Sequence, residues 1–296
     1  QGYMAQGTAR RQIDFNADAA EKLREMADLL EQQNANPFRV RAYQRAAETV
    51  ESCEQDVRDL LARDGVAGLA ELPFIGHGIA GSLQELARYG RLVRMDRLRG
   101  ELDPEELFQT VPGVGTVLAR QIHEVLGVDT LEELEVAAHD GRLERVEGIG
   151  PRKARAMRAS LDEMLRRLRT RPIADRLAPS IEEILDVDEE YRCKVASNEL
   201  PTIAPKRFNP SHRDWLPVLH TERGDWHFTL LFSNTARAHE LGRTQDWVVV
   251  YFYDRDNNEG QHTVVTETRG PLKGKRVVRG LEARCRNFYR VHAKGN

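Results

Sequence analysis

The sequence has few cysteines, few lysines and no long apolar run. Its three cysteines, Cys53, Cys193 and Cys285, lie far apart in a chain of 296 residues and lack the paired spacing of a zinc site or a disulfide framework. Apolar runs such as residues 247–253 are far shorter than the roughly 20 residues of a membrane-spanning helix. We therefore expect a soluble, cytoplasmic protein without a membrane partner.

The chain also lacks the excess positive charge of most proteins that bind phosphate backbones. Lys and Arg number 44 against 47 Asp and Glu, a formal net charge of −3, whereas affinity for a phosphate backbone comes mainly from basic side chains. The positive charge is local instead. Residues 88–99 hold five arginines against one acidic residue, and residues 147–171 hold eight basic residues against three acidic ones. Nucleic acid is therefore a candidate partner only through short basic stretches on an acidic background.

The spacing of apolar residues and the aromatic content of the chain change near residue 170. Before it, apolar residues return every three or four positions, which predicts helices, including one over 18–30 and one over 40–53. After it come all three tryptophans and period-two stretches, which predict antiparallel strands over 215–221, 226–233, 246–253 and 262–268. The sequence thus predicts an α+β multidomain fold with an all-α amino-terminal half and a small antiparallel-sheet domain. We expect a helical domain over 12–100, a second helical domain over 101–170, a linker with a short helix over 171–210, and the α+β domain over 211–296.

One short pattern occurs three times in the amino-terminal half, as Leu72–Ala80, Val111–Ala119 and Val146–Ala154. Each copy has a glycine-containing turn and then the start of a helix. Glycine lets another molecule approach the backbone, and amides at a helix N-terminus bind phosphate. This pattern is typical of the helix-hairpin-helix motif. Such a motif allows an acidic domain to bind DNA through backbone amides and the helix dipole. The residues that would contact DNA are Gly76, Gly78, Gly113, Gly115, Gly148, Gly150, Arg152, Lys153 and Arg155.

Residues from about 17 to 168 resemble the amino-terminal part of bacterial X-family DNA polymerases, the family of DNA polymerase beta. Residues 36–47 are similar to the family's lyase-type domain, and the hairpins are similar to its helix-hairpin-helix region. The resemblance implies binding to nicked or gapped DNA in repair, within the nucleoid. It assigns Arg39, Arg41 and Tyr43 to a phosphate pocket, with a core position as the alternative for Tyr43, and it assigns a monovalent cation to the carbonyls of Val111 and Val114.

Two departures from the family limit what the resemblance implies. The lysine that forms an imine in the lyase reaction is matched by Ser82, and a hydroxyl cannot form an imine. Only Lys22 and Lys153 remain as substitutes in the first 170 residues. In the carboxy-terminal part we recognise no polymerase palm. Asp186 and Asp188 have the spacing of a metal-binding pair, but the Gly-Ser loop that should precede them is missing, so we expect a solvated helix face.

The carboxy-terminal domain contains weaker candidates for chemistry. The three histidines His220, His227 and His239 would suit a metal site. Asp246 and Glu267 lie at expected strand ends and would suit a nuclease that uses a divalent metal. Aromatic residues with arginines among them suit either single-stranded nucleic acid or a domain core.

The sequence is compatible with three functions. The first is a structure-specific DNA-binding protein of repair, which recognises nicked, gapped or branched DNA without polymerase activity and engages a second DNA element or another repair protein. The second is a DNA-processing enzyme, a nuclease or abasic-site lyase, with its active site in the carboxy-terminal domain and with His220, Asp246 and Glu267 as candidate catalytic residues. The third is a scaffold whose hairpins bind only protein.

Overall fold

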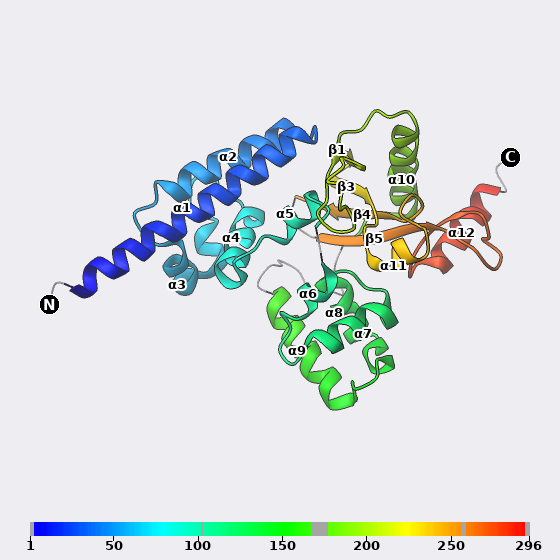
Figure 1. Ribbon diagram of the computed structural model, residues 1–296, viewed down its shortest axis with the longest axis horizontal. Coiled ribbons are helices and arrows are strands. Elements are labelled where there is room, and N and C mark those ends of the chain that lie inside the picture. Colours follow the sequence, from blue (N-terminus) through cyan, green and yellow to red (C-terminus); the bar gives the residue numbers. More distant parts are fainter. Residues whose placement is uncertain (1–2, 102, 167–176, 256–258, 294–296) are drawn as a thin grey trace. The chain divides into compact units, whose positions relative to one another are not determined.

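The computed structural model describes residues 3–101, 103–166, 177–255 and 259–293 (Figure 1). The chain forms two compact units, divided between Arg99 and Gly100. Helices build the amino-terminal half and an antiparallel sheet with helices builds the remainder, so the predicted α+β class is confirmed. Within the described ranges, every helix falls short of the length or the hydropathy that crossing a bilayer requires.

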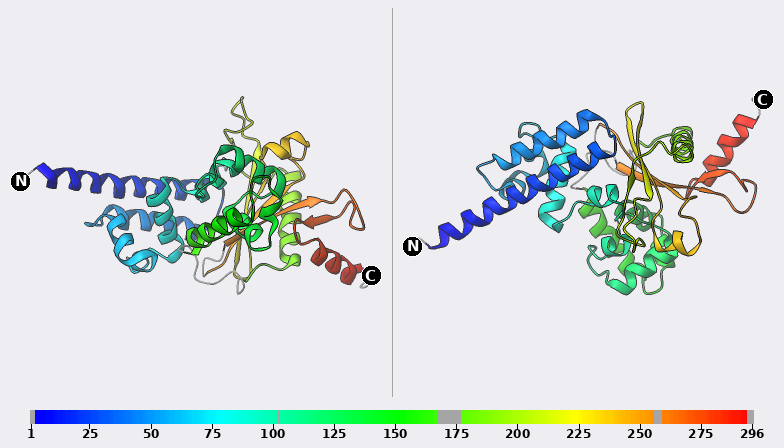
Figure 2. Two further views of the ribbon diagram at one scale, coloured as in Figure 1. Left: turned by 90° about the horizontal axis from the view of Figure 1, so that it is seen from below. Right: turned by 45° about the horizontal axis from the view of Figure 1, so that its top comes forward.

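The first unit is helical and contains a pair of helices joined by a tight turn. The first two helices, dark and lighter blue in Figures 1 and 2, run side by side. Asn36 caps the second helix, because its side chain accepts a hydrogen bond from the Phe38 N–H at 2.9 Å. Most apolar residues from Ala19 to Leu30 and from Val40 to Val50 are buried between these helices and their neighbours. The helices are α1 (Tyr3–Gln32), α2 (Pro37–Glu51), α3 (Val57–Leu69), α4 (His77–Tyr89) and α5 (Val93–Leu98).

The second unit begins with short helices that have their own core. Side-chain oxygens of Asp103 and Thr130 accept backbone N–H groups at the starts of two of these helices. Phe108, Ile122 and Leu134 are fully buried among them. The elements are α6 (Pro104–Phe108), α7 (Thr116–Leu126), α8 (Leu131–His139), the 3-10 helix η1 (Arg142–Arg145) and α9 (Pro151–Arg166).

In the described part of this unit six strands form one antiparallel sheet, with the strands in chain order. Two helices, α10 and α12, pack on the sheet (Figure 1). Tyr191 of α10 is fully buried. Its hydroxyl donates to the Pro217 carbonyl at 2.9 Å and accepts from the Phe232 N–H at 3.0 Å. The elements are α10 (Ile181–Ala196), β1 (Thr202–Ile203), β2 (Leu216–Arg223), β3 (Trp226–Phe232), α11 (Ala236–Glu240), β4 (Val248–Tyr253), β5 (Glu259–Thr266), β6 (Arg276–Val278) and α12 (Glu282–Ala293).

The structure differs from the expected elements at several places. Helix α1 begins near residue 3 and not near residue 18, because apolar periodicity records the packed part of a helix and not its full length. The supposed linker over 171–210 contains α10 and β1, which belong to the core and the sheet of the following domain. Residues 171–176 lie outside the described ranges. Helix α12 had no predicted counterpart. Neither had strand β6, because a three-residue strand is too short to show alternation.

Candidate nucleic-acid interface

The three predicted hairpins share one backbone geometry. In each, the residue at the tip of the turn has positive φ, 62° at Phe74, 82° at Gly113 and 84° at Gly148. The residue after the tip is buried and donates its N–H back across the turn. These closing bonds are Ile75 to Leu72 at 3.2 Å, Val114 to Val111 at 3.1 Å and Ile149 to Val146 at 3.1 Å. One local pattern in the sequence therefore produces one turn three times.

A glycine follows each turn and begins a helix. Gly76 precedes α4, Gly115 precedes α7 and Gly150 precedes α9. A Cβ atom built on any of these three glycines would meet nothing within 4 Å, so the backbone there faces open space. Gly76 and Gly115 have no side-chain cap, and first-turn amides without such a cap suit an anionic oxygen. Gly78 lies in the first turn of α4, where its carbonyl accepts the Ser82 hydroxyl at 3.1 Å.

Tyr43 connects the helical core of the first unit to two arginines. Tyr43 is 3% exposed, so its ring packs in the core while its hydroxyl contacts the arginines. Its hydroxyl lies 3.4 Å from Nη1 of Arg94 and also interacts with Arg39. Burial raises the pKa of this hydroxyl, but the two guanidinium charges outweigh burial and the pKa is lowered. Two guanidinium groups that converge on one hydroxyl suit a phosphate. Arg94 was not a predicted site residue, and the arginine-rich stretch 88–99 was its signal in the sequence.

The remaining basic candidates differ in exposure. Arg41 is exposed on α2, and its guanidinium carbon lies 5.2 Å from the centroid of the Phe38 ring. Arg152 and Arg155 are exposed in the first turns of α9, whereas Lys153 is half-buried. The end of the basic stretch 147–171 falls on residues 167–171, outside the described ranges. The third hairpin thus places exposed arginines directly after its glycine turn.

The carbonyls proposed for a monovalent cation lie in the second hairpin. The Val111 carbonyl accepts the hydrogen bond that closes the turn, and Val114 is 6% exposed. The cation at these carbonyls stays a prediction.

The lyase candidates lie on three different helices. Ser82 is 6% exposed on α4, and its hydroxyl bonds within its own helix. Lys22 lies on α1, with Nζ 3.7 Å from a carboxylate oxygen of Glu25, and Lys153 lies on α9 in the other unit.

The three candidates for nuclease chemistry form structural hydrogen bonds. Asp246 accepts from the N–H of Thr266 at 3.1 Å and from its hydroxyl at 2.6 Å. Glu267 accepts from the Thr268 N–H at 2.8 Å. His220 Nδ1 lies 3.0 Å from the Thr229 hydroxyl. Among the described residues these groups do not form a metal-binding cluster.

The three histidines of the carboxy-terminal domain also have separate neighbours. His227 pairs with Glu222 at 2.9 Å and stacks on Tyr253, with ring centroids 4.8 Å apart. His239 bonds the Asn234 side chain at 2.6 Å. In the part of the chain that the structure describes, His220, His227 and His239 do not gather into a metal site.

The expectation of a solvated face is correct for Asp186, which is exposed, but wrong for Asp188. Asp188 is fully buried and accepts two hydrogen bonds from Arg276, at 2.8 and 3.0 Å, and one from Arg192 at 3.0 Å. Asp186 bonds Arg223 at 2.7 Å. Periodicity placed these carboxylates on a helix but did not show the arginine from β6 that covers one of them. Arg276 continues the network to Asp246 at 3.1 Å.

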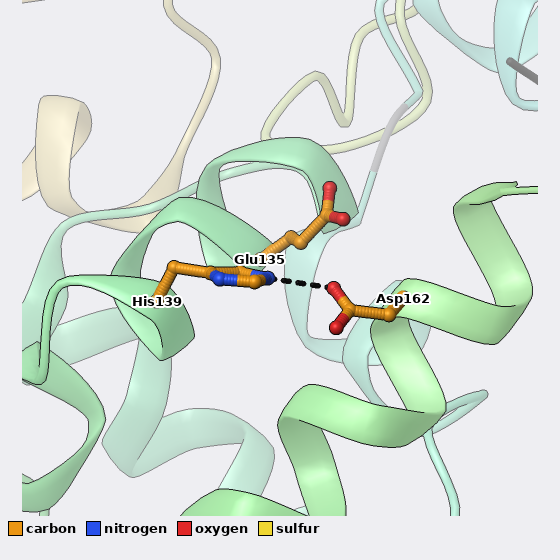
Figure 3. Close-up of side chains that lie close together, drawn as sticks. All are labelled: Glu135, His139 and Asp162. Atoms are coloured by element: carbon orange, nitrogen blue, oxygen red, sulfur yellow. Dashed lines mark hydrogen bonds and ion pairs between the residues drawn. The ribbon is translucent and has the colours of Figure 1, made fainter. Parts of the chain in front are cut away.

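A further cluster of side chains connects α8 and α9. The ligand atoms of Glu135, His139 and Asp162 lie within 4.8 Å of one another, and Figure 3 shows the side chains converging. His139 Nε2 and Asp162 Oδ1 form a hydrogen bond of 2.7 Å, drawn as a dashed line. This hydrogen bond pairs two of the three side chains and links α9, the helix of the third hairpin, to α8. The i, i+4 spacing of Glu135 and His139 was the available sequence signal.

Another titratable cluster supports the second hairpin. His123 of α7 bonds Asp129 at 2.9 Å and lies 3.7 Å from Glu105. Burial lowers the pKa of His123, but the bond to Asp129 and the charge of Glu105 outweigh burial, so the pKa is raised. Burial, together with the Asp129 charge, raises the pKa of Glu133 to about 8. The Glu133 carboxyl accepts the Asp129 N–H at 2.8 Å.

Glu133→Gln is expected to flatten the dependence of stability on pH. The folded chain holds the Glu133 proton above the unfolded pKa of about 4.3, so stability falls as the pH rises from there through about 8. A glutamine cannot ionise, so the variant should melt above the unsubstituted protein at pH 8.5 and near it at pH 5. Thermal melts from pH 5 to 9 measure this, with Glu124→Gln, at an exposed position on α7, as the control. Parallel curves for Glu133→Gln and the unsubstituted chain would contradict it.

Comparison with known proteins agrees with this geometry. Residues 14–92 match the family model described as a helix-hairpin-helix domain, and residues 105–163 match a SAM-like helix-hairpin-helix tandem. The chain is 29% identical over 172 residues to the DNA polymerase/3'-5' exonuclease PolX of Bacillus subtilis (strain 168). That match covers 57% of this chain and 29% of the relative. The amino-terminal half of the chain therefore carries helix-hairpin-helix domains and resembles the X-family DNA polymerases.

Proposed function

We propose that the chain binds nicked, gapped or branched DNA as a structure-specific, nucleoid-associated protein of DNA repair, without polymerase activity. The proposal rests on the three copies of the hairpin. In each copy the backbone at the start of a helix, at Gly76, Gly115 and Gly150, faces open space. Amides at such turns bind phosphate without a basic surface, which fits a chain with a net charge of −3.

The phosphate pocket around Tyr43 supports a preference for DNA with a strand break. A terminal phosphate carries more charge and more free oxygens than a phosphate within an intact strand. Arg39 and Arg94 converge on the Tyr43 hydroxyl and would pair with those oxygens. A strand break would therefore satisfy the pocket, while the hairpins hold the flanking strands.

The candidate carboxylates of the carboxy-terminal domain do not favour nucleotide transfer. Polymerisation requires carboxylates that hold two metal ions. Asp188 is instead occupied by Arg276 and Arg192, and Asp246 by Arg276 and Thr266. We propose that this domain engages a second DNA element or another repair protein.

The test compares duplexes of one sequence that are intact, nicked, or gapped by one nucleotide with a 5′-phosphate. Fluorescence anisotropy measures affinity, and denaturing gels with and without Mg²⁺ or Mn²⁺ monitor cleavage. We expect tighter binding to the gapped duplex and no cut strand. Equal affinity for intact and gapped DNA would contradict structural specificity. A cut strand would favour the nuclease or lyase alternative, and no binding at low salt would favour a protein-binding scaffold.

Arg152→Ala and Arg155→Ala are each expected to weaken binding equally for all DNA sequences. These exposed side chains follow the third glycine turn, so they would contact phosphates, which carry no base information. Each lost contact should reduce the slope of log affinity against log salt by about 0.9. Anisotropy titrations measure the slope between about 50 and 200 mM salt. Over this range the affinity of phosphate-contacting proteins for DNA falls strongly. Arg63→Ala, an exposed arginine of α3 outside the hairpins, is the control, and unchanged slopes for the α9 variants would exclude a phosphate contact.

A further inference from the structure

Phe74 occupies the position where the other two hairpins have glycine. Its φ of 62° corresponds to 82° at Gly113 and 84° at Gly148. A side chain with a Cβ rarely adopts this left-handed conformation, and a large aromatic residue is unfavourable there. The side chain is also 59% exposed, so no burial in the core compensates for the conformation. A residue that violates both local preferences marks a position where function outweighs them.

The surrounding contacts hold this turn in place. The residue after Phe74, Ile75, is 3% exposed and closes the turn on Leu72. The hydroxyl of Thr49 on α2 donates to the Pro73 carbonyl at 2.9 Å and fixes the turn against that helix. The ring therefore projects from a backbone that is anchored on both sides.

The chemistry beside the ring is cationic. The guanidinium carbon of Arg45 lies 5.1 Å from the centroid of the Phe74 ring. Arg45 and Arg41 are both exposed, one turn apart on α2. The open N-terminus of α4 follows two residues after Phe74. An aromatic ring among guanidinium groups and helix-start amides complements a ligand that combines a flat face with phosphate.

We infer that Phe74 stacks on the terminal base pair exposed at a strand break, while the amides after Gly76 hold the adjacent phosphate. This inference rests on the proposed function. Inside an intact duplex both faces of each base pair are covered by neighbours, so the ring has no face to contact. At a nick or gap one face becomes accessible beside a phosphate, and aromatic side chains commonly occupy such steps. Phe74 thus distinguishes broken from intact DNA.

The experiment compares the unsubstituted chain with Phe74→Gly and Phe74→Leu. Glycine restores the residue found at the tips of the other hairpins and removes the ring, so the variant is expected to fold as before. Its affinity for gapped DNA should fall about tenfold, while its affinity for the intact duplex stays unchanged. Leucine keeps apolar bulk without an aromatic face and should lose most of the gap preference. Val291→Ala, which shortens another exposed apolar side chain, is the control.

A fluorescent base analogue, 2-aminopurine, at the 5′ end of the downstream strand reports stacking directly. Binding of the unsubstituted chain should quench it, and Phe74→Gly should leave it bright. If Phe74→Gly keeps both the gap preference and the quenching, the stacking inference is overturned and the proposed function stands. If the unsubstituted chain itself shows no gap preference, both fail.

Discussion

Alanine at Gly76, Gly115 and Gly150 together is expected to abolish measurable DNA binding while leaving the fold intact. Gly76 and Gly115 have φ of −81° and −93°, which alanine adopts without strain. At all three glycines a Cβ would project into open space. We therefore expect each substitution to cost less than about 1 kcal/mol in folding stability. The added methyl groups would occupy the space that a phosphate oxygen needs in order to reach the helix amides.

Each single substitution should weaken binding about tenfold, because a hydrogen bond to a charged group contributes about 1.5–3 kcal/mol and 1.4 kcal/mol is a factor of ten. The three turns share no residues, so the effects should add to about a thousandfold. Anisotropy titration at low salt measures the loss, and thermal melting checks the fold. Gly113→Ala provides the contrast, because its φ of 82° should make alanine lower stability as well as binding. Normal affinity of the triple variant would show that the hairpins do not contact phosphate.

Arg276→Met is expected to destabilise the carboxy-terminal domain by about 3–5 kcal/mol, because it leaves a buried carboxylate without its main partner. Arg276 is 12% exposed in its side chain and Asp188 is 0% exposed. The guanidinium bonds both Asp188 oxygens and also reaches Asp246, so one side chain joins α10, β6 and the residues before β4. Removing it breaks both the link to α10 and the link to Asp246.

Urea denaturation followed by tryptophan fluorescence measures this loss, since the three tryptophans all lie in this domain. The double variant Asp188→Leu/Arg276→Met provides the control, because it removes the buried charge along with its partner. It should recover much of the stability that the single variant loses. Equal destabilisation of both variants would show that packing, and not the uncompensated charge, sets the cost.

The sequence alone determined the parts of this protein that depend on neighbouring residues. The hairpins are the clearest case, because each turn is closed by a hydrogen bond between residues three apart, within its own short pattern. The buried faces of α1 and α2 followed from periodicity for the same reason. The family resemblance then connected these local patterns to DNA.

Tertiary structure decided whatever depends on partners distant in sequence. Asp188 looked solvent-exposed on its helix until β6 brought Arg276 to it across 88 residues. Arg94 reaches the hydroxyl of Tyr43 across 51 residues. The segment around α10, expected to be a linker, became core because the sheet supplied an apolar face for it. Local patterns determine the path of the backbone, whereas burial and charge pairing depend on which distant segments the fold brings into contact.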